Sequence, residues 1–153
     1  MLQDEKSFFL GEKPMSVYHD ELTIQTKREG EIIDLTDEVE KLVHLSHIQD
    51  GLACIFVPGS TGAVTTMEYE PGLLKDIPRA LERLAPKNMP YDHHETWHDD
   101  NGRSHVRASI LGPSLTVPVH DGHLIHGTWQ QLVFIELDTQ PRTRKLVIHI
   151  IGE

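Results

Sequence analysis

The dipeptide Asp121-Gly122, set between two short β-rich runs, constrains the fold of this chain more than any other feature. Residues 114–120 precede it and residues 123–127 follow it. A two-residue connection of this composition is typical of a tight β-hairpin, because Asp and Gly both tolerate the positive φ angles that such a turn needs. The sequence therefore predicts an antiparallel pair here, with His120 and His123 opposite one another at its tip.

Other segments of the chain carry the same strand pattern, and two carry a helical one. We expect further strands at residues 18–26, 32–33, 52–57, 63–68, 105–111, 129–137 and 145–151. Residues 36–45 place apolar side chains at helical spacing. Pro71 suits the first turn of a second helix, which Pro78 should kink or divide in two. The fold class predicted is α+β, dominated by antiparallel pairs.

Length and charge limit the classes of function. The 153 residues fit one domain, and the net charge of −10 disfavours broad attraction to nucleic acid or to an anionic membrane. Cys54 has no disulfide partner, which favours a reducing compartment, and no apolar stretch reaches the ~20 residues that span a bilayer. We expect a cytoplasmic protein with one domain at residues 15–153, preceded by an extension at residues 1–14.

Residues 91–131 contain seven of the eleven histidines of the chain. Histidine binds metals and exchanges protons near neutral pH, so a cluster beside carboxylates suits either chemistry. His93, His94, His98, Asp99 and Asp100 occupy a predicted loop that can fold over His105. Their spacing matches no recognised zinc motif, and structural ion pairs or exposed histidines produce similar clusters.

The predicted strand at residues 105–111 has one polar face. Alternation along a strand places His105, Arg107 and Ser109 on the same side. An imidazole, a guanidinium and a hydroxyl in a row can bind a phosphate or carboxylate, although a solvated strand face looks the same. Gly59-Ser60-Thr61-Gly62, between two predicted strands, can likewise be a backbone anion site or a simple hairpin connection.

One segment carries a family resemblance. SLTVPVHDGHLIHGTWQQLVFIELD, at residues 114–138, closely resembles the signature of the YjbQ family, with a specific core at Gly122 to Gln130. The resemblance extends through NGRSHVRASILGPS, through Tyr91 to His93 and through the segment VPGSTGAVTTMEYEPG. It covers residues 15–152, and it implies a single α+β domain with a mainly antiparallel curved sheet or sandwich and two or three short helices.

The same resemblance implies candidate site residues. His93 and His105 match recurrent histidines of the family, Glu68 matches a recurrent acidic residue, and Asn101 matches the residue before a glycine. Many relatives have His-Thr-Thr where this chain reads Gly59-Ser60-Thr61, so one expected imidazole is missing. Either another histidine substitutes for it, or the metal or acid/base role differs in this subgroup.

The family is also associated with homotrimers and with weak thiamine-phosphate synthase activity, which implies a small phosphorylated molecule as partner. In that reaction Arg107, Ser60, Thr61, Ser109 and a divalent ion, zinc or magnesium, would stabilise the departing diphosphate. His105 would donate a proton, while His93 and Glu68 would orient the metal, with His105 as a second ligand. Glu68, Arg107 and Asn101 are the other catalytic residues implied. The alternatives are a metal- or phosphometabolite-binding trimer without turnover, and histidines at a pH-sensitive subunit interface.

Overall fold

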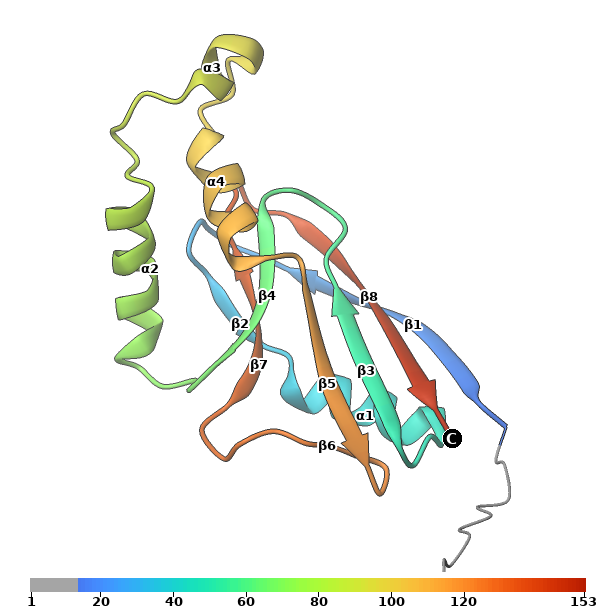
Figure 1. Cartoon of the computed structure of the whole chain (residues 1–153). Coiled ribbons are helices and arrows are strands. Elements are labelled where there is room, and N and C mark those ends of the chain that lie inside the picture. The colour runs from blue at the N-terminus through green and yellow to red at the C-terminus, as the bar shows by residue number, and fades with distance from the viewer. Residues whose placement is uncertain (1–13) are drawn as a thin grey trace, which may run out of the picture.

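Two antiparallel sheets and four helices make up the described chain (Figure 1). The computed structural model describes residues 14–153, so the extension predicted at residues 1–14 lies, apart from Pro14, outside the described residues. The strands are β1 (Ser16–Gln25), β2 (Ile32–Asp34), β3 (Gly51–Phe56), β4 (Gly62–Met67), β5 (Ser114–His120), β6 (His123–Leu124), β7 (Gln131–Glu136) and β8 (Thr143–Gly152). The helices are α1 (Thr36–Ser46), α2 (Leu73–Leu84), α3 (Asp92–Trp97) and α4 (Gly102–Leu111). The predicted α+β class is confirmed.

The larger sheet has the strand order β1-β8-β3-β5-β6, and the smaller sheet has the order β2-β7-β4. Each of these neighbouring pairs is antiparallel. The β5–β6 hairpin turns at Asp121 and Gly122, whose φ angles are 51° and 75°. His120 pairs with His123 across it, as the two-residue turn predicts.

The smaller sheet is covered on both faces, which explains why its central strand β7 is buried almost throughout. Leu132 and Phe134 face the main core, which is shared with the larger sheet and α1. Val133 and Ile135 face a second core, to which α2 and α4 contribute. A strand buried on both faces has a continuous apolar sequence instead of an alternating one. The space inside is tight, because a Cβ added to Gly62 would lie 2.8 Å from the Phe134 ring.

Pro78 lies inside a single helix, α2, which is one of the two outcomes that the sequence left open. Helices α3 and α4 differ from the sequence prediction. The strand predicted at residues 105–111 is wrong, because this segment is the helix α4. The buried positions Arg103, Ser104, Arg107 and Ala108 follow the helical period, and the prediction missed it because it took Arg107 for a surface residue. The predicted loop before it contains the short helix α3, so residues 14–153 contain four helices where two or three were expected.

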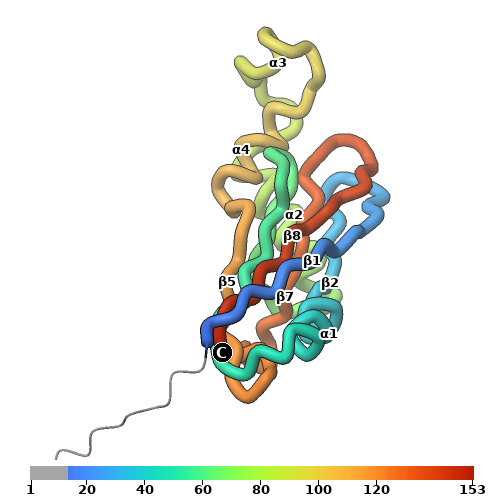
Figure 2. The backbone as a smooth tube through the Cα atoms, turned by 90° about the vertical axis from the view of Figure 1, so that its right-hand side faces the viewer, coloured from blue at the N-terminus to red at the C-terminus, as the bar shows by residue number. Residues whose placement is uncertain are grey.

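The helices α3 and α4 extend the molecule at one end. Figure 2 shows α3 and the first turn of α4 beyond the ends of the strands, where the β3–β4 and β7–β8 connections also lie. Among residues 14–153, no helix is both long and apolar enough to cross a membrane.

Candidate functional site

His93 and His105 come together at the end of the molecule formed by α3 and α4. Their ring centroids lie 4.4 Å apart, and the rings are tilted by 46°. His93 Nε2 lies 3.6 Å from Asp99 Oδ1. The short helix α3 folds the histidine-rich segment over the first turns of α4, so the predicted approach of His93 and Asp99 to His105 is found. His94 and His98 instead pair with one another, with ring centroids 5.7 Å apart.

The surroundings of His105 favour its neutral form. Partial burial lowers the pKa of His105, and the neighbouring His93 lowers it further, while the carboxylates of Asp99 and Asp138 partly offset both effects. A histidine whose pKa lies below its ordinary value is uncharged at neutral pH and can accept a proton.

Arg107 does not share a face with His105. Residues two apart on a helix point in different directions, and the Arg107 side chain is only 5% exposed. Its guanidinium donates to Glu29 at 3.0 Å, to Glu82 at 2.7 Å and to the Ala85 carbonyl oxygen. Each nitrogen of the guanidinium thus donates a hydrogen bond to a protein oxygen. Arg107 links α4 to α2 and to the segment after β1, and it is not available as a phosphate ligand.

Ser60 and Ser109 share a shallow cavity of about 210 Å³ beside α4. This Ser60–Ser109 cavity is lined by Gly59, Ser60, Gly62, Ala108, Ser109 and Pro113. Ser109 lies one helical turn after His105, and its Oγ donates to the His105 carbonyl oxygen at 2.8 Å. Sites for drug-sized ligands usually exceed about 300 Å³, so this volume suits a phosphate-sized group better than a whole metabolite.

Thr61 lies in an ion-pair network and does not line the cavity. It is 6% exposed, and its Oγ1 donates to Asp138 Oδ2 at 3.1 Å. Arg144 donates to the same hydroxyl through Nη2 at 3.0 Å and to Glu136 through Nε at 2.8 Å. Asp138 also accepts from Arg142 at 2.9 Å. The network therefore contains two arginines and two carboxylates.

The Nη1 group of Arg144 is a hydrogen-bond donor that the neighbouring atoms of the described chain leave free. The sequence did not lead us to predict this residue as part of the site. Among residues 14–153, no atom accepts a hydrogen bond from its Nη1, and a Cβ added to Gly59 would lie 3.5 Å from that nitrogen. Nη1 therefore lies near Gly59, one of the residues that line the Ser60–Ser109 cavity, although Arg144 itself is not a lining residue. The available signal was the alternation of Glu136, Asp138, Arg142 and Arg144 around the β7–β8 connection, which predicts paired charges on one side of two adjacent strands.

Glu68 and Asn101 have different positions relative to this site. Glu68 is exposed after the far end of β4, and the six residues of that strand separate it from Thr61 by about 20 Å. Within one chain it does not join the histidine pair. Asn101 directly precedes α4, and its Oδ1 is buried without a hydrogen-bond partner, as is the Oγ of Ser104. Buried polar atoms of this kind usually have a water or ligand partner.

The predicted metal site at His93 and His105 has an incomplete ligand set. A protein zinc site takes three or four side-chain ligands. Among residues 14–153, the trio of histidine and acidic side chains whose ligand atoms lie within 4.8 Å of one another is Glu40, His44 and His123, at another place on the molecule. The His93–His105 metal site therefore stays a prediction.

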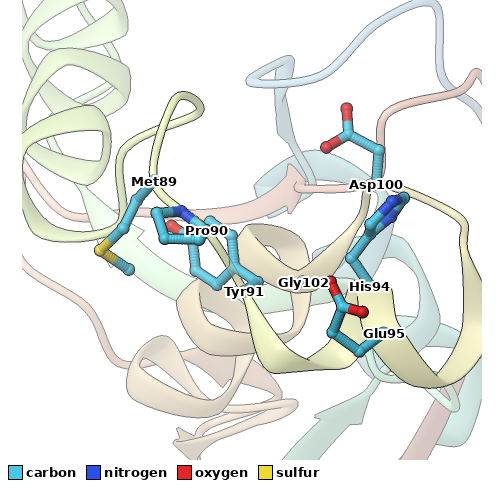
Figure 3. A pocket seen from close by; sticks show the side chains of 7 residues that line it. All are labelled: Met89, Pro90, Tyr91, His94, Glu95, Asp100 and Gly102. Carbon is cyan, nitrogen blue, oxygen red and sulfur yellow. The ribbon is translucent and has the colours of Figure 1, made fainter.

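A second cavity, of about 150 Å³, lies beside α3 (Figure 3). His94, Glu95 and Asp100 line one part of it and Met89, Pro90 and Tyr91 the other, with Gly102 between them. Gly102 is needed there, because an added Cβ would lie 2.6 Å from Cβ of Tyr91. This cavity has no lining residue in common with the Ser60–Ser109 cavity.

Comparison with known proteins connects this architecture to one family. The family model described as UPF0047 protein YjbQ-like matches residues 20–153. A UPF0047 protein of Archaeoglobus fulgidus is 42% identical over 128 residues, which are 84% of this chain and 97% of that protein. UPF0047 protein YugU of Bacillus subtilis is 36% identical over 86% of this chain and 97% of its own length.

Solved structures agree with the sequence matches. A Sulfolobus solfataricus protein, described as YbjQ-like and of unknown function, superposes with a TM-score of 0.87 at 36% identity, covering 92% of this chain and all of that one. Hypothetical protein APE1520 of Aeropyrum pernix superposes with a TM-score of 0.82 at 32% identity, covering 89% and 99%. Sequence and fold thus agree over nearly the whole described chain, and the protein belongs to the YjbQ-like UPF0047 family.

Proposed function

We propose that the Ser60–Ser109 cavity binds the phosphate or diphosphate end of a small molecule, and that His105 moves a proton beside it. The observation that carries this proposal is the spare Nη1 of Arg144 next to Gly59. A guanidinium with free N–H groups is a strong donor for phosphate oxygens. The hydroxyl of Ser60 lines the same cavity and adds a neutral donor, whereas that of Ser109 already donates to the His105 carbonyl oxygen.

We expect His105 to supply positive charge when an anion binds, because the nearby arginines are already paired with carboxylates. Glu136 and Asp138 already neutralise Arg144 and Arg142, so a bound phosphate would add uncompensated negative charge. That charge would raise the pKa of His105, which burial and His93 lower in the free protein. Binding would therefore shift His105 toward its protonated form, the form that can donate a proton to a departing phosphate oxygen.

The reaction that we propose for these groups is the thiamine-phosphate synthase-like transfer that the family resemblance implies. The thiazole nitrogen forms a bond to the methylene carbon of the activated pyrimidine, while the bond from that carbon to the diphosphate oxygen breaks. The diphosphate leaves with the electron pair, and Arg144, Ser60 and protonated His105 would stabilise its charge. Arg144 takes the place that the sequence prediction gave to Arg107.

A test of turnover compares the tag-free wild type with His105→Ala and with His19→Ala, an exposed control on β1. With a thiazole phosphate and a pyrimidine diphosphate as substrates, we expect saturable formation of thiamine phosphate in the wild type and in His19→Ala. His105→Ala should lose at least about 100-fold in rate, the usual contribution of a general acid. Equal rates in the wild type and His105→Ala would reject the catalytic role.

Binding separates this proposal from a protein without turnover. Titration calorimetry with inorganic diphosphate should show one site per chain, weakened in Arg144→Lys, which keeps the charge of Arg144 but loses its fork of donors. Binding by the wild type with no turnover would favour the alternative, a phosphometabolite-binding protein. No binding, or unchanged binding in Arg144→Lys, would reject the anion site itself.

A further inference from the structure

We infer that Glu40, His44 and His123 form a zinc site at the end of the molecule opposite α3 and α4 (Figure 1). Glu40 and His44 lie on α1, and His123 begins β6 directly after the hairpin turn. We call these three residues the α1–hairpin cluster. One ligand atom of each residue lies within 4.8 Å of those of the other two, although about eighty positions of sequence separate His123 from the helix.

The distances between the three ligand atoms fit a tetrahedral ion. In a zinc site with bonds of about 2.0–2.1 Å, neighbouring ligand atoms lie about 3.3 Å apart. His44 Nε2 lies 3.3 Å from His123 Nδ1 and 3.4 Å from Glu40 Oε1. The third edge, His123 Nδ1 to Glu40 Oε1, is 2.7 Å, the length of a hydrogen bond. An ion would need to lengthen only this edge, by about 0.6 Å.

The backbone around the cluster holds the ligands in place. Glu40 and His44 are four residues apart on α1, so both side chains project from one face of the helix. The Leu124 N–H donates to Glu40 Oε2 at 3.0 Å, which leaves Oε1 turned toward the two imidazoles. The Gly122 N–H donates to the Gln49 carbonyl oxygen at 3.0 Å and fixes the hairpin tip against the segment that follows α1.

The three ligand atoms face one another closely enough to share one cation. The ring nitrogens of His44 and His123 are 3.3 Å apart, and Glu40 Oε1 lies against both. A single divalent ion accepts lone pairs from both neutral imidazoles and from Glu40 together. Two histidines and one glutamate are also a ligand set that zinc takes in proteins.

The exposure of the cluster predicts an open site. The side chains of His44 and His123 are 52% and 63% exposed, and that of Glu40 is 25% exposed. Solvent can therefore reach the ion, and water can take the fourth position, since the chain supplies three ligands. The bound ion would join α1 to the tip of the β5–β6 hairpin and keep one exchangeable coordination position.

The test is zinc titration of the tag-free full chain after removal of metal with a chelator. Calorimetry should give a zinc site that is lost or weakened more than about tenfold in His44→Ala, His123→Ala and Glu40→Gln. His47→Ala, which removes an exposed histidine just after α1, should bind as the wild type does. His93→Ala is the second control, because it removes a ligand of the separately predicted metal site.

A spectroscopic measurement keeps the inference testable if a variant folds poorly. Cobalt added to the folded wild type should give the intense visible absorption of a tetrahedral site, and zinc should abolish it. His123→Ala alters only an exposed hairpin residue and should keep the wild-type circular dichroism while losing the cobalt signal. Zinc binding unchanged in the cluster variants, binding lost in His93→Ala instead, or a wild type that binds neither metal would each overturn the inference.

Discussion

At the scale of single residues, Glu29 is the shared ion-pair partner of two buried arginines of α4. Glu29 accepts from Arg103 at 2.8 Å and from Arg107 at 3.0 Å, and these arginine side chains are 2% and 5% exposed. Removing the partner of a buried charge is strongly destabilising. Glu29→Gln should therefore lower the free energy of unfolding by about 3 kcal/mol in urea. Lys41→Ala, which breaks an exposed ion pair with Glu38, should change it by less than about 0.5 kcal/mol; equal losses in the two variants would contradict the prediction.

His105 supplies a second prediction at this scale, on the pH dependence of stability. Its folded-state pKa is lowered by burial and by His93, so folding favours the neutral imidazole. That contribution is fully present above the unfolded pKa of about 6.5 and is lost as the pH falls through the lower folded value. Between pH 7 and pH 5, wild type should lose more stability than His105→Gln, measured by urea unfolding at each pH. Parallel curves for the two proteins would show that His105 titrates normally.

At the scale of elements, turn chemistry and alternation predicted the strands well, because both act over a few residues. The β5–β6 hairpin follows directly from Asp121-Gly122. The helix α4 was missed because its buried face includes Arg103 and Arg107, whose partners lie far away in sequence. The same limit applies to the site. The approach of His93 to His105 was predicted from local density, but the roles of Arg144 and His123 depend on contacts between distant strands and helices.

The helix α2 carries the prediction at this scale. Pro78 is the sixth of its twelve residues, where a missing N–H and a crowded ring cost a helix about 3 kcal/mol relative to alanine. The ring also lies near Gly30, since a Cβ built there would be 3.6 Å from Pro78 Cβ and 3.8 Å from its Cγ; alanine keeps only the Cβ, so part of the gain is lost with the Cγ. Pro78→Ala should raise the free energy of unfolding by about 1–2 kcal/mol, scored by chemical denaturation. Alanine at the exposed position Lys75 should leave it nearly unchanged, and a destabilised Pro78→Ala would mean that the proline ring is needed for packing.

At the scale of the whole molecule, the homotrimer implied by the family resemblance stays a prediction that the exposed tryptophans make testable. Trp129 is 73% exposed in the β6–β7 connection, where Ile125 is 51% exposed, so one short segment presents two large apolar side chains to solvent. Such a patch is typical of a surface that a second copy covers.

Light scattering after gel filtration should give about 52 kDa, three times the 17.4 kDa chain. Trp129→Ser should shift the protein toward monomer, whereas Trp97→Ser, which alters a tryptophan 68% exposed on α3, should leave the mass unchanged. A monomeric wild type would reject the trimer, and loss of assembly in Trp97→Ser alone would place the interface at α3, beside the His93–His105 pair.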